Sequence, residues 1–97
     1  MALFEELLDK LAKDADISEG ELREGVGQLI GGLPNGKITA DELSGEVEKL
    51  SLRGGNWPKL VAQLRPKLQK LRGPLGFLAM ATVNSELEEL RKHRSGI

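Results

Sequence analysis

Cysteine and tyrosine are absent from this 97-residue chain, and only one histidine, one tryptophan and two phenylalanines occur. Without cysteine no disulfide can compensate for a small core, so stability has to come from packing, and the composition fits a reducing compartment. No apolar run approaches the ~18 residues of a membrane span, and Glu5 and Glu6 stand where a secretory leader would carry basic residues. We therefore expect a cytoplasmic protein that does not bind membranes.

Residues that usually carry catalysis are equally scarce. Zinc sites need clustered cysteine or histidine, whereas the one histidine, His93, stands between Lys92 and Arg94 at an end that we expect to fray. The glycines match neither spacing of the phosphate-binding loops, and no sequence signature places a base beside a serine or threonine nucleophile. We expect neither enzymatic activity nor a metal, a cofactor or a small-molecule substrate.

The residues that are present favour helices. Leucine, alanine, valine and isoleucine supply most of the hydrophobic positions, while runs of β-branched or aromatic residues typical of strands are absent. Glycine-rich or glycine–proline breaks separate segments whose hydrophobic residues recur at helical spacing. The sequence predicts an all-α fold, a single compact domain (1–97) of about five helices. Three acidic helices lie in 1–53, a basic helix at 56–72 and an apolar C-terminal helix at 74–92.

Local signals place the ends of these helices. Ser18 and Thr39 are each followed three residues later by glutamate, a spacing in which the two side chains reciprocally cap a helix start. Asn56 can cap the basic helix, whose interior Pro66 predicts a kink or a brief break on the outer side. Gly25 lies beside an apolar stripe, where it either allows close helix approach or is simply tolerated.

The segment before the third helix resembles the second half of an EF-hand calcium loop. Positions 5, 6, 8 and 12 of such a loop correspond to Asn35, Gly36, Ile38 and Glu42. Positions 1 and 3 would be Gly31 and Leu33, which supply no side-chain oxygen, whereas calcium takes 6–8 oxygen ligands. The resemblance implies a degenerate EF-hand-like protein without tight calcium binding. A glycine turn before a capped helix accounts for the same residues.

Charge is divided unequally along the chain. Residues 1–50 hold 5 Lys/Arg and 12 Asp/Glu, whereas residues 51–97 hold 9 and 3. No acidic residue occurs from 49 to 85, and the predicted basic helix carries five cations: Lys59, Arg65, Lys67, Lys70 and Arg72. Either the acidic half of the same chain neutralises these charges, or they bind an acidic partner.

The C-terminal helix is apolar on every side at its start. Its large hydrophobic residues exceed what one helix face can bury: Leu75, Phe77, Leu78, Met80 and Val83. Such a segment is buried either in the core of a monomer or against another chain. We therefore predict a noncatalytic protein-interaction or regulatory module that docks an acidic protein partner or forms a homodimer.

A nucleic-acid-binding regulator is the alternative function, because the five cations of the basic helix can contact phosphates. A helix-turn-helix is not expected. The connection from Ile30 to Ile38 is longer than the turn of that motif, and the helix that follows it is acidic where a recognition helix would approach phosphates.

Overall fold

The computed structural model describes the backbone of residues 3–95 and the side chains of residues 4–92. Within this range the chain forms five α-helices: α1 (Leu3–Asp14), α2 (Glu19–Gly32), α3 (Ala40–Lys49), α4 (Trp57–Gln69) and α5 (Gly76–Ser95). Two short 3-10 helices, η1 (Leu50–Arg53) and η2 (Lys70–Arg72), follow α3 and α4, and the described residues contain no strand. The Cα radius of gyration of 12.7 Å is that of a compact domain of this length. The predicted all-α fold is confirmed.

Two of the expected caps form at helix starts. At α3 the Thr39 hydroxyl accepts from the Glu42 amide at 3.1 Å, and Glu42 Oε1 accepts from the Thr39 amide at 2.8 Å. At α2 the Ser18 hydroxyl accepts from the Glu21 amide at 3.2 Å, but the reciprocal bond from the Ser18 amide to the Glu21 side chain is not observed, so only half of the predicted cap forms. Asn56 occupies the cap position of α4 but makes no side-chain hydrogen bond there, so the cap expected of it is not observed.

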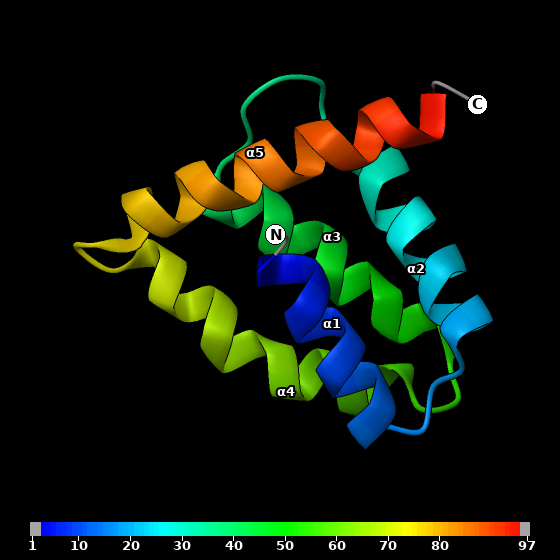
Figure 1. The fold of residues 1–97 in the computed structure, drawn as a ribbon. Helices are drawn as coiled ribbons and strands as arrows, with labels where there is room; N and C mark the ends of the chain where they lie inside the picture. The colour runs from blue at the N-terminus through cyan, green and yellow to red at the C-terminus, as the bar shows by residue number, and fades with distance from the viewer. Residues whose placement is uncertain (1–2, 96–97) are drawn as a thin grey trace.

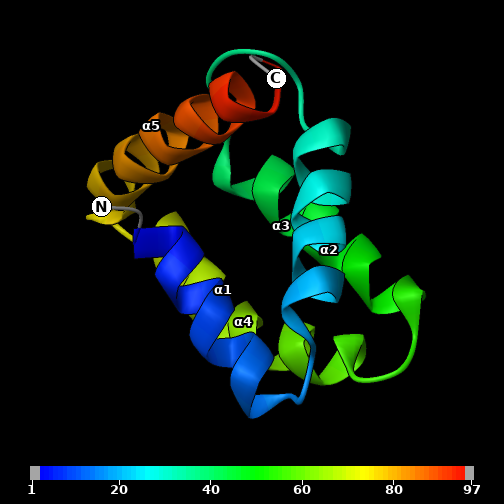
Figure 2. The same ribbon diagram turned by 45° about the vertical axis from the view of Figure 1, so that its right-hand side comes forward.

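The helices enclose one core. α4 and α5 meet at the turn around residues 73–75 and diverge from it as a V, while α1 runs from the middle of α5 towards the start of α4 (Figures 1 and 2). α1 packs against α2, α4 and α5, and α3 packs against both α2 and α4. The largest fully buried side chains come from α2, α3 and α4: Leu29, Leu43, Val47, Leu60, Val61 and Leu64.

A glycine sets the contact between α2 and α4. Gly25 of α2 is buried against the indole of Trp57, and a Cβ atom at position 25 would overlap that ring. The guanidinium of Arg53 lies 5.1 Å from the centre of the same ring, within range of a cation–π interaction. Gly25 therefore allows close helix approach, which is the first of the two roles expected for it.

The sequence predicts a kink or a brief break at Pro66, and α4 continues through this residue without a break. Pro66 is exposed on the outer side of the helix, so the backbone hydrogen bond that proline cannot donate is missing at the surface and not in the core. The helix changes to η2 only at Lys70, after the last fully helical turn has placed Leu68 in the core. α4 thus presents one uninterrupted outer surface to solvent.

Two polar side chains attach α5 to the segment between α2 and α3. Asn84 Oδ1 accepts from the Ile38 amide at 2.9 Å, and Asn84 Nδ2 donates to the Ile38 carbonyl at 3.2 Å. One residue before the end of the described side chains, Arg91 Nη2 donates to the carbonyls of Leu33 at 3.2 Å and Pro34 at 2.6 Å. These bonds fix the rotation of α5 about its axis, and therefore decide which of its side chains face the core.

A third polar side chain attaches α5 to α1. The carboxylate of Glu86 is buried, and both of its oxygens accept from the Phe4 amide, at 2.8 and 3.0 Å. A carboxylate in this position satisfies an otherwise unpaired amide and complements the positive end of the α1 dipole. Glu86 therefore caps α1 through an amide that lies 82 residues earlier in the chain.

Candidate protein-interaction surface

Two of the five cations expected to bind a partner are paired within the molecule. Arg65 and Glu48 of α3 form a double hydrogen bond, with Nε to Oε2 at 2.6 Å and Nη2 to Oε1 at 2.8 Å. Arg65 donates these hydrogen bonds, which lower the pKa of Glu48 and raise the pKa of Arg65. Arg72 Nη2 lies 2.7 Å from Asp41 Oδ1. Carboxylates from the acidic half of the chain therefore neutralise the charges of Arg65 and Arg72.

The other three cations, Lys59, Lys67 and Lys70, are exposed, and none has an ion pair among the residues that the structure describes. At about 100° per residue their positions fall within roughly 80° of one another on the helical wheel. They lie on the side of α4 and of the start of η2 that faces away from Arg65, and are called the lysine face below. The lysine face is thus the part of the predicted basic surface that stays available to a partner.

Three hydrophobic side chains are exposed at the turn from α4 to α5. Leu75, Phe77 and Leu78 expose 74%, 67% and 59% of their surface, and we call them the apolar corner. The segment 75–78 that carries these side chains lies at the point of the V formed by α4 and α5 (Figure 1). Leu52 of η1 is also exposed, at 85%, but it lies in a different element.

The remaining two residues expected to take part in association belong to the core. Met80 and Val83 are each 8% exposed and pack in the same cluster as Leu87. The bonds of Asn84 and Glu86 turn this side of α5 inward, which leaves Leu78 outside. The monomer therefore buries most of Met80 and Val83 itself, which is the first of the two alternatives given for this segment, so neither residue is part of the exposed apolar corner; the small exposed part of Val83 lines the slot described next.

A slot opens beside the lysine face, where the start of α1, the end of α4 and the first half of α5 meet. Its volume is about 190 Å³. Six hydrophobic residues form most of its walls: Phe4, Leu7, Leu68, Leu71, Ala79 and Val83. Lys67, Thr82 and Glu86 complete the lining, and Lys67 therefore belongs both to the slot and to the lysine face. We call this cavity the three-helix slot.

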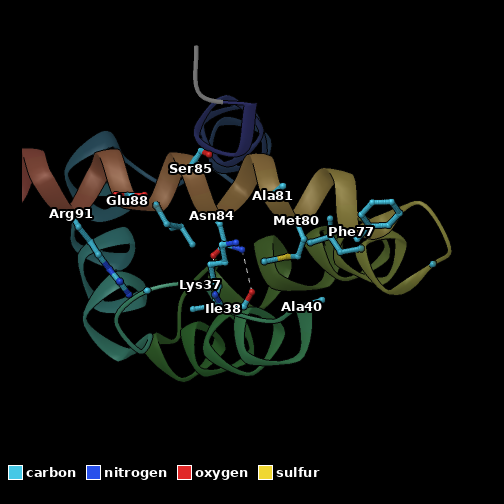
Figure 3. Close-up of a pocket in the computed structure, with 14 residues that line it drawn as sticks. Lys37, Ile38, Ala40, Phe77, Met80, Ala81, Asn84, Ser85, Glu88 and Arg91 are labelled. Carbon is cyan, nitrogen blue, oxygen red and sulfur yellow. Dashed lines mark hydrogen bonds between the residues drawn. The ribbon is translucent and has the colours of Figure 1, made fainter.

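A larger groove of about 850 Å³ follows the opposite side of α5. Its lining includes Met80 and Ala81 of α5 and Ile38 and Ala40 before and in α3, and the paired hydrogen bonds from Asn84 to Ile38 cross it (Figure 3). Charged side chains of both signs, among them Lys37 and Glu88, also line it. The groove consequently has neither a continuous apolar floor nor one sign of charge.

Sequence analysis did not identify Asn84, Glu86 and Arg91 as the residues that position this surface. A weak signal existed for Glu86, since it follows Val83 by three residues and precedes Leu90 by four, and so falls on the hydrophobic stripe of α5. A charged residue on such a stripe needs a buried partner. That the partner would be the Phe4 amide depends on the tertiary fold.

No three histidine, aspartate or glutamate side chains in the described part of the chain gather closely enough to hold a metal ion. Glu42, which would fall at position 12 of a calcium loop, accepts from the Thr39 amide instead. The side chain of His93 and the end of the tail expected to fray lie outside the described residues.

Comparisons of the chain with protein-family models, with curated proteins and with solved structures give no match. Within residues 3–95, none of the helices combines the length and the hydrophobicity that crossing a membrane requires.

Proposed function

We propose that this protein is a noncatalytic protein-interaction module with a regulatory role, and that it binds a partner protein through the apolar corner and the adjoining lysine face. One observation carries the proposal. Leu75, Phe77 and Leu78 are exposed together in a chain that buries 22 other hydrophobic residues in its core. Covering each would contribute about 1–2 kcal/mol to association at the usual free energy per area. Adjacent exposed hydrophobic residues of this kind commonly mark an interface.

The charge beside the corner supports an acidic partner. Lys67 and Lys70 precede the apolar corner in the chain, and no acidic residue occurs between positions 49 and 85. A homodimer with twofold symmetry through this surface would bring both lysine faces into one interface, because both subunits use the same patch. Like charges across an interface are unfavourable, so a different protein with carboxylates around an apolar anchor fits better than a second copy.

Nucleic-acid binding is the second candidate, and it has less support. Arg65 and Arg72 are already engaged with carboxylates, and a phosphate backbone would leave Phe77 and Leu78 uncovered. Such a complex depends on counterion release and weakens steeply with salt, whereas burial of apolar side chains does not. We place the module in the cytoplasm, a location that the absence of cysteine supports.

Site-specific photocrosslinking in the cells that express the protein tests this function. A photoreactive phenylalanine analogue replaces Leu78 in one variant of the protein and Leu52 in another. Both positions are highly exposed, and only Leu78 belongs to the apolar corner. We expect ultraviolet light to crosslink the Leu78 variant to a defined partner protein, and to give little crosslinking of the Leu52 variant.

Four outcomes would contradict the proposal. Equal crosslinking at both positions would show that the partner does not bind preferentially at the apolar corner. The absence of a protein adduct at Leu78 would rule out the proposed function. An adduct with nucleic acid at Leu78 would favour the second candidate. An adduct of twice the mass of the chain would identify a second copy as the partner, and would overturn the argument from opposed lysine faces.

A further inference from the structure

The concave part of the surface indicates what the partner carries. The three-helix slot lies next to Leu78, since Ala79 and Thr82 of the same helix line it. At about 190 Å³ it has room for a single large hydrophobic side chain rather than for a cofactor or a drug-sized ligand, which occupy roughly 300 Å³ or more. An anchor side chain on the partner therefore suits the slot better than a separate small molecule.

The charges around the slot define the flanks of that anchor. Lys67 forms part of the wall, Lys70 follows it by one turn, and Lys59 precedes it by about two turns. At 1.5 Å per residue the lysine face extends over about 16 Å, along α4 and into the start of η2. Glu86 also lines the slot, but both of its oxygens accept from the Phe4 amide. The cations that a partner would meet here thus form a row along α4 and the start of η2.

We infer that the partner segment is an acidic amphipathic helix, which lies along α4 and α5, inserts a hydrophobic side chain into the three-helix slot and places carboxylates on the lysine face. The inference rests on the function proposed above. A helix of about three turns spans the row of lysines, and its hydrophobic stripe at i, i+3 or i+4 and i+7 covers Leu78 as well as the slot.

The shape of the surface separates this partner from a membrane. Glu5 and Glu6 are exposed in the first turn of α1, directly beside Phe4 and Leu7 of the slot wall. A flat anionic bilayer resting on the slot would meet these carboxylates, whereas a helix about 10 Å wide can follow α4 and α5 past them. The groove on the other side of α5 is less suitable, because the bonds of Asn84 cross it.

Selection from a displayed library of random 16-residue peptides, with the full chain as bait, tests the inference without a known partner. We expect enriched peptides to combine hydrophobic residues at helical spacing with an excess of Asp and Glu. A synthetic copy of the best peptide is then measured by fluorescence anisotropy. Lys67→Glu/Lys70→Glu should weaken its binding at least about tenfold, because two attractions become two repulsions.

Matched variants locate the binding site. Lys13→Glu/Lys37→Glu makes the same change of charge away from the lysine face and should alter affinity less than about twofold. Ala79→Trp obstructs the mouth of the slot and should abolish binding, whereas Ala62→Trp, at an exposed position elsewhere on α4, should not. A peptide with Lys in place of Asp and Glu should recover binding to Lys67→Glu/Lys70→Glu.

Several results would overturn the inference. These are enriched peptides without acidic excess, affinity unaffected by Lys67→Glu/Lys70→Glu or by Ala79→Trp, no enriched peptide at all, or stronger binding to phosphatidylserine vesicles than to any peptide. The two proposals fail separately. If Leu78 crosslinks to a protein but selected peptides are not acidic, the acidic helix is wrong and the interaction function stands.

Discussion

At the residue scale, single atoms decide how closely the helices approach. Gly25 has no side chain, and the indole of Trp57 occupies the space where one would be. Glu86 is the only buried polar side chain among the described residues, and its carboxylate accepts a hydrogen bond from one amide of α1. Each of these residues has a specific role that a change of a few atoms would remove.

Gly25→Ala should therefore destabilise the fold. The added methyl group must displace Trp57, at a cost of about 1–3 kcal/mol, which exceeds the helix-propensity gain of about 1 kcal/mol. Gly45→Ala is the control, because nothing lies within 4 Å of a Cβ atom at that helical position, and it should be neutral or stabilising. Urea unfolding followed by circular dichroism measures both. Equal stability of the Gly25→Ala variant and the wild type would contradict the packing described.

Glu86→Ala should cost about 1–3 kcal/mol, because it leaves the Phe4 amide without its acceptor. Hydrogen exchange of the first α1 amides should accelerate at the same time, since the start of the helix loses its cap. Glu86→Gln keeps an acceptor oxygen and should lose less. Glu89→Ala, at an exposed position on the same helix, should change stability by less than about 0.5 kcal/mol. Unchanged exchange in α1 would show that Glu86 is not its cap.

At the element scale, ion pairs and side-chain amides orient helices that hydrophobic packing holds together. The Arg65–Glu48 pair joins α4 to α3, Arg72–Asp41 joins η2 to the start of α3, and Asn84 joins α5 to the segment before α3. These contacts turn the arginines of the basic helix towards the acidic helices and leave its lysines outward. The division between structural arginines and available lysines is thus a property of how the elements pack.

The pair between α3 and α4 predicts a pH dependence. Arg65 lowers the pKa of Glu48 in the folded state, so the stabilisation is complete above the unfolded pKa of about 4.3 and is lost as pH falls through the lower folded value. Glu48→Gln should therefore be less stable than the wild type at pH 7, and the difference should diminish towards pH 3. Urea unfolding at both pH values measures this.

Asp9→Asn provides the comparison for that experiment. Asp9 is exposed in α1 and has no ion pair among the described residues, so its replacement should not give a difference that follows the same pH course. A Glu48→Gln effect of equal size at pH 7 and pH 3 would show that the pair contributes nothing through its charge.

At the scale of the whole molecule, the sequence predicts where helices begin better than it predicts which of their side chains are exposed. Helix starts at Ser18 and Thr39 could be predicted because a cap needs only residues three positions apart. The exposure of Phe77 and the burial of Met80 could not, because both residues belong to a segment that is apolar on every side. Which side faces inward depends on bonds from Asn84 to Ile38, 46 residues away. The same holds for the arginine pairs, whose partners come from another helix.

The cap of α1 by Glu86 also determines the order of events when the chain is synthesised. The amide that needs the carboxylate belongs to the first helix, and the carboxylate belongs to the last, 82 residues later. While the ribosome is still translating the intervening helices, α1 has neither its cap nor the wall of α5 against which Phe4 is buried. The core therefore closes only after α5 has been synthesised, and a nascent chain that stalls before Glu86 retains a leucine-rich α1 without its cap, which chaperones can bind.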